Sequence, residues 1–178
     1  MRVRAAVVPL VALAVFVLDQ ISKFVISTHF ELDSAWFPIP FLKSLFGITY
    51  IHNTGAAFGI LPNQNLVFSI IALIVVVVIV VYVRRNPNID LLLAISLGLL
   101  LGAASGNLVD RVRYGYVVDF LYVKYWAVSN VADVCITTGV ILLAYYLITH
   151  ADKPAATQAA SAQPAVPPTE DSASIDQN

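Results

Sequence analysis

Residues 66–83 read LVFSIIALIVVVVIVVYV, an apolar run without a charged side chain. Its valines and isoleucines favour strands in water, but a continuous apolar run of this length is typical of a helix that crosses a membrane. Spanning a hydrocarbon core of about 30 Å takes about 20 helical residues. This stretch therefore predicts a protein built from membrane-spanning helices.

Three further apolar segments flank this run, and each is long enough to span: residues 5–26, 91–109 and 131–148. The first could instead be a secretory signal peptide, because Arg2 and Arg4 precede it, but no small-residue cleavage site follows it. We therefore predict an all-α membrane protein with four transmembrane helices.

Composition agrees with this fold class and excludes several functions. The chain has 178 residues, of which 59% are hydrophobic and 12% charged, which is too apolar for a soluble domain of this size. A net charge of −1 gives no electrostatic basis for nucleic-acid binding. Cys135 is the single cysteine, and the histidines form no zinc-binding pattern, so we expect neither a disulfide nor a metal or other cofactor.

The chain divides into one transmembrane domain, residues 1–150, and a tail, residues 151–178. The tail is rich in Ala, Pro, Ser and Gln and has few large apolar residues, so we expect it to be disordered. An extracytoplasmic insertion covers about residues 28–65. Within it, residues 36–42 are apolar and interrupted by prolines, which indicates a segment lying on the membrane surface, and residues 45–51 favour a short β-sheet.

Basic residues indicate the orientation of the helices. With four spans, both termini and the loop between the second and third spans share one side of the membrane. Each side carries five basic residues: Arg2, Arg4, Arg84, Arg85 and Lys153 against Lys23, Lys43, Arg111, Arg113 and Lys124. If Lys23 and Arg111 serve a polar site, the remaining count favours cytoplasmic termini and a cytoplasmic tail.

Polar residues gather at the outer ends of the predicted spans. An ionisable residue within a span costs about 2.5–3.5 kcal/mol on insertion scales, so each one suggests a functional site. The residues that this topology places together are Asp19, Asn53, Asn107, Asp110, Asp119, Asn130 and Asp133. We therefore predict one polar site at the outer boundary of the membrane.

Asp119 and Asp133 are the candidates for chemistry. A carboxylate in the first turn of a helix can simply match the helix dipole, which would account for Asp133 but not for Asp119 among valines and aromatics. Two carboxylates in a site of low dielectric share a proton, because both cannot ionise freely. The ionised one can take a proton from water while the protonated one polarises a carbonyl, as in aspartic proteases.

The other polar residues allow more than one interpretation. Asp19 and Lys23 have the i,i+4 spacing of an ion pair. Arg111 could close a helix end by pairing with Asp110, or hold a substrate carbonyl with its planar fork. Asn53 could bind a peptide backbone or cap its own turn.

Two alternative functions compete with hydrolysis. Membrane carboxylates can relay protons or bind cations, as in a small proton- or cation-coupled transport protein. Acids at one surface only, in four spans without a second half, argue against a pathway through the membrane. The other alternative is a noncatalytic assembly factor whose acids only pair with basic residues.

Five short motifs occur in order along the chain: DQISK (19–23), NTGAAF (53–58), GNLVDR (106–111), VVDF (117–120) and NVAD (130–133). Together they resemble the lipoprotein signal peptidases, or signal peptidases II, of bacteria, over about residues 5–150. The resemblance implies an aspartyl endopeptidase of the bacterial cytoplasmic membrane. It also implies a small extracytoplasmic β-sheet and a surface helix within residues 28–65, and both termini in the cytoplasm.

The resemblance further implies substrates, inhibitors and residue roles. Such enzymes cleave the signal peptide from diacylglyceryl-modified prolipoproteins, before the lipidated cysteine, and bind globomycin-type inhibitors. We expect these partners, contact with membrane lipid and a monomeric chain. By motif position, the roles are catalysis for Asp119 and Asp133, substrate binding for Asn53, Asn107, Arg111 and Asn130, and support for Asp19, Lys23 and Asp110.

Because no metal-ligand pattern occurs in the sequence, we expect EDTA to leave the activity intact. The measurement is the rate of prolipoprotein cleavage with and without the chelator. A loss of activity that zinc restores would identify a metal enzyme instead.

Overall fold

The computed structural model describes residues 3–55 and 63–150 and contains four long helices. They are α1 (Val3–His29), α2 (Asn65–Arg85), α3 (Leu91–Tyr114) and α4 (Val131–His150). All four are long and apolar enough to cross a membrane, so the predicted four-helix architecture is confirmed. The disorder predicted for the tail concerns residues 151–178, which lie outside the described residues.

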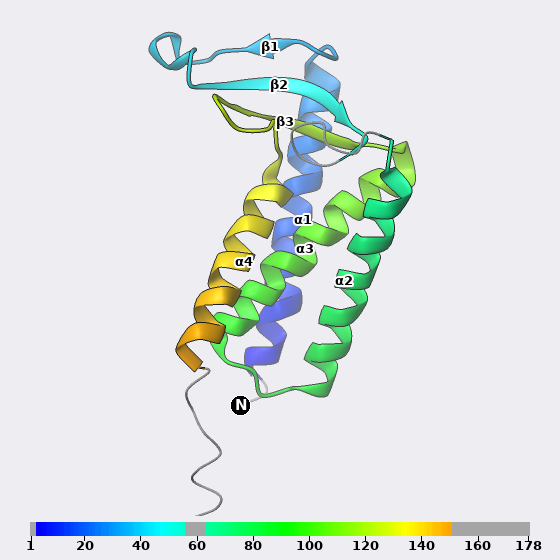
Figure 1. Cartoon of the computed structure of the whole chain (residues 1–178), viewed down its shortest axis with the longest axis vertical. Coiled ribbons are helices and arrows are strands. Elements are labelled where there is room, and N and C mark those ends of the chain that lie inside the picture. The colour runs from blue at the N-terminus through cyan, green and yellow to red at the C-terminus, as the bar shows by residue number, and fades with distance from the viewer. Residues whose placement is uncertain (1–2, 56–62, 151–178) are drawn as a thin grey trace, which may run out of the picture.

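Three antiparallel strands cover one end of the helices (Figure 1). They are β1 (Ala35–Trp36), β2 (Phe46–Asn53) and β3 (Val117–Val123), in the spatial order β1-β2-β3. The small sheet is therefore confirmed. Between β1 and β2 the chain forms the 3₁₀ turn η1 (Pro40–Leu42), and the surface helix expected within residues 28–65 stays a prediction, because residues 56–62 lie outside the described residues. Pro38 and Pro40 explain the shortness of η1, because each removes a backbone N–H that a longer helix would need.

Helix α3 is the centre of the bundle and packs against α1, α2 and α4 (Figure 1). Small residues allow this, since lipid supplies no hydrophobic drive between helices and close backbone contact must replace it. At Gly102, a Cβ would meet the backbone carbonyl of Ala12 and would lie 2.8 Å from the Cβ of Val15. The small-residue stretch of α3 therefore places α1 and α3 in direct backbone contact.

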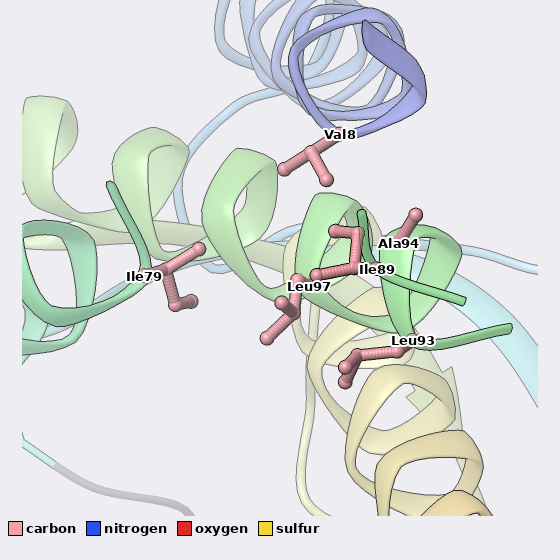
Figure 2. Close-up of a cluster of buried hydrophobic side chains, with 6 residues drawn as sticks. All are labelled: Val8, Ile79, Ile89, Leu93, Ala94 and Leu97. Atoms are coloured by element: carbon pink, nitrogen blue, oxygen red, sulfur yellow. The ribbon is translucent and has the colours of Figure 1, made fainter. Parts of the chain in front are cut away.

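A cluster of buried apolar side chains holds the helices together at the end away from the sheet (Figure 2). Its members come from α1, α2, α3 and the α2–α3 connection: Val8, Ile79, Ile89, Leu93, Ala94 and Leu97. The outward-facing side chains of the spans are also apolar, as at Leu66 of α2 and Ile148 of α4, and are suited to contact with lipid. The charged groups of the bundle interior thus have to be sought at the sheet end.

The turn from α3 into β3 brings the third strand back over the helix ends. Gly115 ends α3 with a φ of 81°, a left-handed conformation that glycine adopts without strain. Strand β3 then pairs with β2, with Ile51 opposite Asp119. Side chains alternate along a strand, and Val118 and Phe120 pack with Ile26 and Tyr50. Asp119 therefore faces away from this cluster.

We expect Gly102→Ala to destabilise the bundle by about 1–3 kcal/mol, the usual cost of an overpacked contact. The added methyl would press on the backbone of α1, which cannot yield as a side chain can. Thermal unfolding in detergent micelles measures the effect, with Ser105→Ala on the same helix as the matched control. Equal unfolding temperatures for the two variants would contradict the close contact between α1 and α3.

Candidate functional site

Strand β3 places Asp119 in the interior, where its side chain is only 1% exposed. Two asparagine amides hold its carboxylate. Asn53 Nδ2 donates to Oδ2 at 2.7 Å, and Asn130 Nδ2 donates to Oδ1 at 2.6 Å. These donors come from β2 and from the residue before α4, so Asp119 joins the sheet to the last helix.

Asp133 lies in the first turn of α4, where it forms a reciprocal cap with Asn130. The Asp133 N–H donates to Asn130 Oδ1 at 3.0 Å, and the Asn130 N–H donates to Asp133 Oδ2 at 3.2 Å. This is the arrangement of a capping box, built here from Asn and Asp. Because the same Asn130 amide donates to Asp119, one side chain links the two carboxylates.

Asn107 of α3 provides a second donor to Asp133. Its Nδ2 lies 3.1 Å from Asp133 Oδ1, while its Oδ1 accepts a hydrogen bond of 2.8 Å from Lys23 Nζ. An ammonium can only donate, so Lys23 fixes the orientation of the Asn107 amide. The amide N–H groups must therefore face Asp133.

Lys23 is itself buried, with 3% of its surface exposed, between two acids. Its Nζ lies 2.8 Å from Asp19 Oδ2 and 2.8 Å from Asp110 Oδ2. The ion pair predicted from the spacing of Asp19 and Lys23 is confirmed. In contrast, the alternative pairing of Asp110 with Arg111 is wrong, because the carboxylate of Asp110 turns toward α1 and Lys23.

Arg111 lies beside the carboxylates, and one nitrogen of its guanidinium group has no hydrogen-bond partner in the structure. Its Nη1 donates weakly to the Asn107 carbonyl at 3.4 Å, and its guanidinium lies 5.6 Å from the centre of the Phe68 ring. Its Nε is buried and has no hydrogen-bond partner in the structure. Buried donors are normally satisfied, so this one is available to an incoming acceptor.

The structure brings all nine predicted residues into one network. Asn53 caps its own turn, since the Gly55 N–H donates to its Oδ1 at 2.9 Å, whereas its binding of a peptide backbone stays a prediction. The remainder of that motif, residues 56–58, lies outside the described residues. Sequence reasoning missed Gln20, whose Nε2 donates to Asp110 at 3.0 Å and to Asp19 at 3.3 Å. Its position inside the DQISK motif was the available signal.

Asp133 reaches the surface, unlike Asp119. It borders a pocket of about 230 Å³ on α4 and the loop before it, together with Trp126, Ser129, Val134, Thr137 and Thr138. In the described part of the chain, no three His, Cys, Asp or Glu side chains are placed to hold a metal ion. The site thus offers a carboxylate pair, amide donors and a guanidinium.

The electrostatics of the pair differ from those of two free acids. Burial, and next the negative charge of Asp133, raise the pKa of Asp119 from 3.8 to about 7. Near neutral pH the pair can therefore hold one proton. That state combines an acid and a base in one site, which is what hydrolysis of a carbonyl compound without a metal requires.

Comparison with known proteins gives consistent matches. The family model described as signal peptidase (SPase) II matches residues 11–149. The lipoprotein signal peptidase of Moorella thermoacetica is 45% identical over 139 residues, covering 78% of this chain and 91% of the relative. That of Bacillus velezensis is 38% identical over 148 residues, covering 81% of this chain and 95% of the relative.

Two solved structures, both described as bacterial membrane enzymes, share the fold. The first has a TM-score of 0.74 and 32% identity, and the match covers 82% of this chain and 90% of that chain. The second has a TM-score of 0.70 and 32% identity, and the match covers 79% of this chain and 92% of that chain.

We expect Asp119 to titrate at about 7 in the folded protein, and its pKa to fall in Asp133→Asn, because the ionised form no longer meets a second negative charge. The infrared carboxyl band, assigned by its loss in Asp119→Asn, measures both values. Between pH 3.8 and about 7 the folded protein keeps a proton that the unfolded chain has released, so this group's contribution to stability falls as the pH rises. An Asp119 band that titrates near 3.8, or one that Asp133→Asn leaves unchanged, would contradict the coupling.

Proposed function

Because the chain belongs to the lipoprotein signal peptidase family, we propose that Asp119 and Asp133 are the catalytic pair with which it cleaves its substrates. It is an aspartyl peptidase that processes prolipoproteins. The observation that carries the assignment of the pair is the Asn130 side chain, which caps Asp133 and donates to Asp119. No other pair of carboxylates in the described residues is joined in this way without a lysine between them.

The chemistry follows from one proton held by two carboxylates. The ionised carboxylate accepts a proton from a water molecule as the water oxygen attacks the scissile carbonyl carbon. The protonated carboxyl donates to the carbonyl oxygen, which gives a neutral tetrahedral diol. The carbon–nitrogen bond then breaks, the leaving amine takes the proton that came from water, and the other carboxylate recovers its proton from the diol.

Arg111 and the three asparagines are the groups we assign to the substrate backbone. The unpartnered Nε of Arg111 is a donor for a peptide carbonyl beside the pair. Asn53, Asn107 and Asn130 each donate an amide N–H to a carboxylate of the pair, and this contact supports their assignment beside the substrate. Asp19, Lys23 and Asp110 support the site without reaching the substrate.

The substrate we propose is a diacylglyceryl-modified prolipoprotein, cut immediately before the lipidated cysteine. A lipid-anchored peptide diffuses within the membrane and presents its peptide bond at the boundary with water. The polar network lies at the sheet end of the four helices, which suits that depth (Figure 1). Toward the opposite end, the buried cluster of Figure 2 consists of apolar side chains only, which gives no support for a transport pathway.

The remaining features of the proposal concern placement and partners. We place the protein in the bacterial cytoplasmic membrane, with both termini in the cytoplasm and the site toward the outer face. Residues 1–150 form the peptidase domain, with the extracytoplasmic insertion at about 28–65, and residues 151–178 are a cytoplasmic tail. The protein acts as a monomer and binds globomycin-type inhibitors at the carboxylate pair.

We expect Asp119→Asn and Asp133→Asn each to lower kcat for a diacylglyceryl-modified prolipoprotein by at least about 10²–10⁴-fold, the usual contribution of general acid–base catalysis. Each amide keeps the shape of the side chain but cannot exchange the proton. Cleavage by the protein purified in detergent is followed by the change in substrate mass.

The matched control is Asp33→Asn, the same chemical change at an exposed aspartate of the β1 turn, which should retain the wild-type rate. Turnover at the wild-type rate in either Asp119→Asn or Asp133→Asn would exclude that residue from the pair.

A further inference from the structure

A second group of three charged residues lies directly behind the carboxylate pair. Asp19 and Asp110 are 0% and 1% exposed, and both contact the Lys23 ammonium at 2.8 Å. Gln20 adds a second connection between the two acids, through Nε2 at 3.3 Å from Asp19 and 3.0 Å from Asp110. The group therefore joins α1 and α3 at a fixed separation.

Each of its acids also accepts a backbone N–H from outside the group. Asp19 Oδ1 lies 3.0 Å from the N–H nitrogen of Ala132, the residue immediately before Asp133. Asp110 Oδ2 lies 3.4 Å from the N–H nitrogen of Val118, the residue immediately before Asp119. One acid thus holds the start of α4, the other holds β3, and Lys23 connects them.

We propose that Asp19, Lys23 and Asp110 are positioning residues that set the separation between Asp119 and Asp133, by holding the backbone directly before each of them. The inference rests on the proposed function, because it matters only if these two carboxylates work as a pair. Neither acid touches the pair itself. The role therefore lies in geometry, and a displacement of about 1 Å in such a site can cost about 10²-fold in rate.

Stability alone is a poor explanation for this group. Burying an ion pair gains little over apolar packing, and charges inside a membrane are costly. A small apolar contact would join α1 to α3 at lower cost, as Gly102 already does. What apolar side chains cannot do is accept the two backbone N–H groups beside the pair.

The charges of the group permit a clean test. One lysine and two aspartates carry a net charge of −1, so the loss of either acid leaves a neutral Lys–Asp pair rather than a stranded ammonium. Asparagine at position 19 or 110 removes one charge and keeps an oxygen that can accept the backbone N–H. Leucine has the same branching and removes both the charge and the acceptor, so the difference between the two variants reports the backbone hydrogen bond.

The experiment measures kcat and KM of Asp19→Leu against Asp19→Asn, and of Asp110→Leu against Asp110→Asn, on a diacylglyceryl-modified prolipoprotein in detergent. We expect each leucine variant to have a kcat at least about 10-fold below its asparagine counterpart, with KM changed by less, since the substrate does not contact this group. Equal kcat values within both pairs would overturn the positioning role. A wild-type protein that does not cleave would instead overturn the proposed function.

The pH profile provides a readout that a purely structural role would not move. The carboxylate of Asp119 interacts electrostatically with Asp133 of α4, Lys23 of α1 and Arg111 of α3. Leucine and asparagine remove the same charge, so their profiles should coincide unless the distance between the carboxylates changes. If that distance grows, repulsion from Asp133 weakens, the pKa of Asp119 falls, and the basic limb of kcat/KM, where the pair loses its single proton, shifts to lower pH in the leucine variant.

A further variant moves Asp19 without altering any charge. A Cβ at Gly106 would collide with Asp19 Oδ2, the free end of a side chain, so Gly106→Ala can fold while displacing that carboxylate. We expect its kcat to fall at least about 10-fold, and the Ala132 amide to exchange hydrogen faster, which mass spectrometry of residues 131–134 detects without substrate. Wild-type exchange and wild-type kcat in this variant would overturn the proposal even if the leucine variants do not fold.

Discussion

A lysine ammonium in the interior of a membrane protein needs an acceptor for each of its three N–H groups, and Lys23 has all three. Asp19, Asp110 and Asn107 surround it at 2.8 Å each. These contacts determine much of the sheet end of the molecule. They join α1 to α3, orient the amide of Asn107 toward Asp133, and turn Asp110 away from Arg111, which leaves that guanidinium beside the carboxylate pair. Because an unpaired charge at this depth is costly, few other arrangements of these side chains are open to the chain.

The two carboxylates of the pair occupy unlike positions although they share a donor. Asp133 lies at a helix N-terminus, where aligned backbone dipoles favour negative charge, and it reaches the surface. Asp119 lies on a strand, where dipoles largely cancel, and it is buried. Asn130 connects the two environments and keeps them distinct. Two identical side chains can thus hold unequal shares of one proton, which is the condition for acid and base to work together.

The sequence predicted much of this arrangement, because its strongest signals are local or follow from topology. Uninterrupted apolar runs define the four spans, and the alternation of direction between spans brings Asp19, Asp110, Asp119 and Asp133 to one depth. The i,i+4 spacing gave the Asp19–Lys23 pair. What it could not give are contacts between distant positions, such as Asp110 with Lys23 or Asn130 with Asp119. Within residues 36–42, Pro38 and Pro40 limit the chain to a 3₁₀ turn, while the surface helix expected within residues 28–65 stays a prediction because residues 56–62 lie outside the described residues.

The two roles of Asn130, in capping α4 and in binding Asp119, affect how the protein folds during membrane insertion. The Asn130 side chain caps the first turn of α4 and its amide donates to Asp119, so the residue that starts the fourth helix also contacts both carboxylates. Asp19 near the start of the chain also depends on α4, because its carboxylate accepts the Ala132 N–H only when α4 has packed against α1. During insertion, the proposed carboxylate pair is therefore incomplete until the last span is in place. Under the proposed function, a partly inserted copy lacks one of its two carboxylates and is inactive.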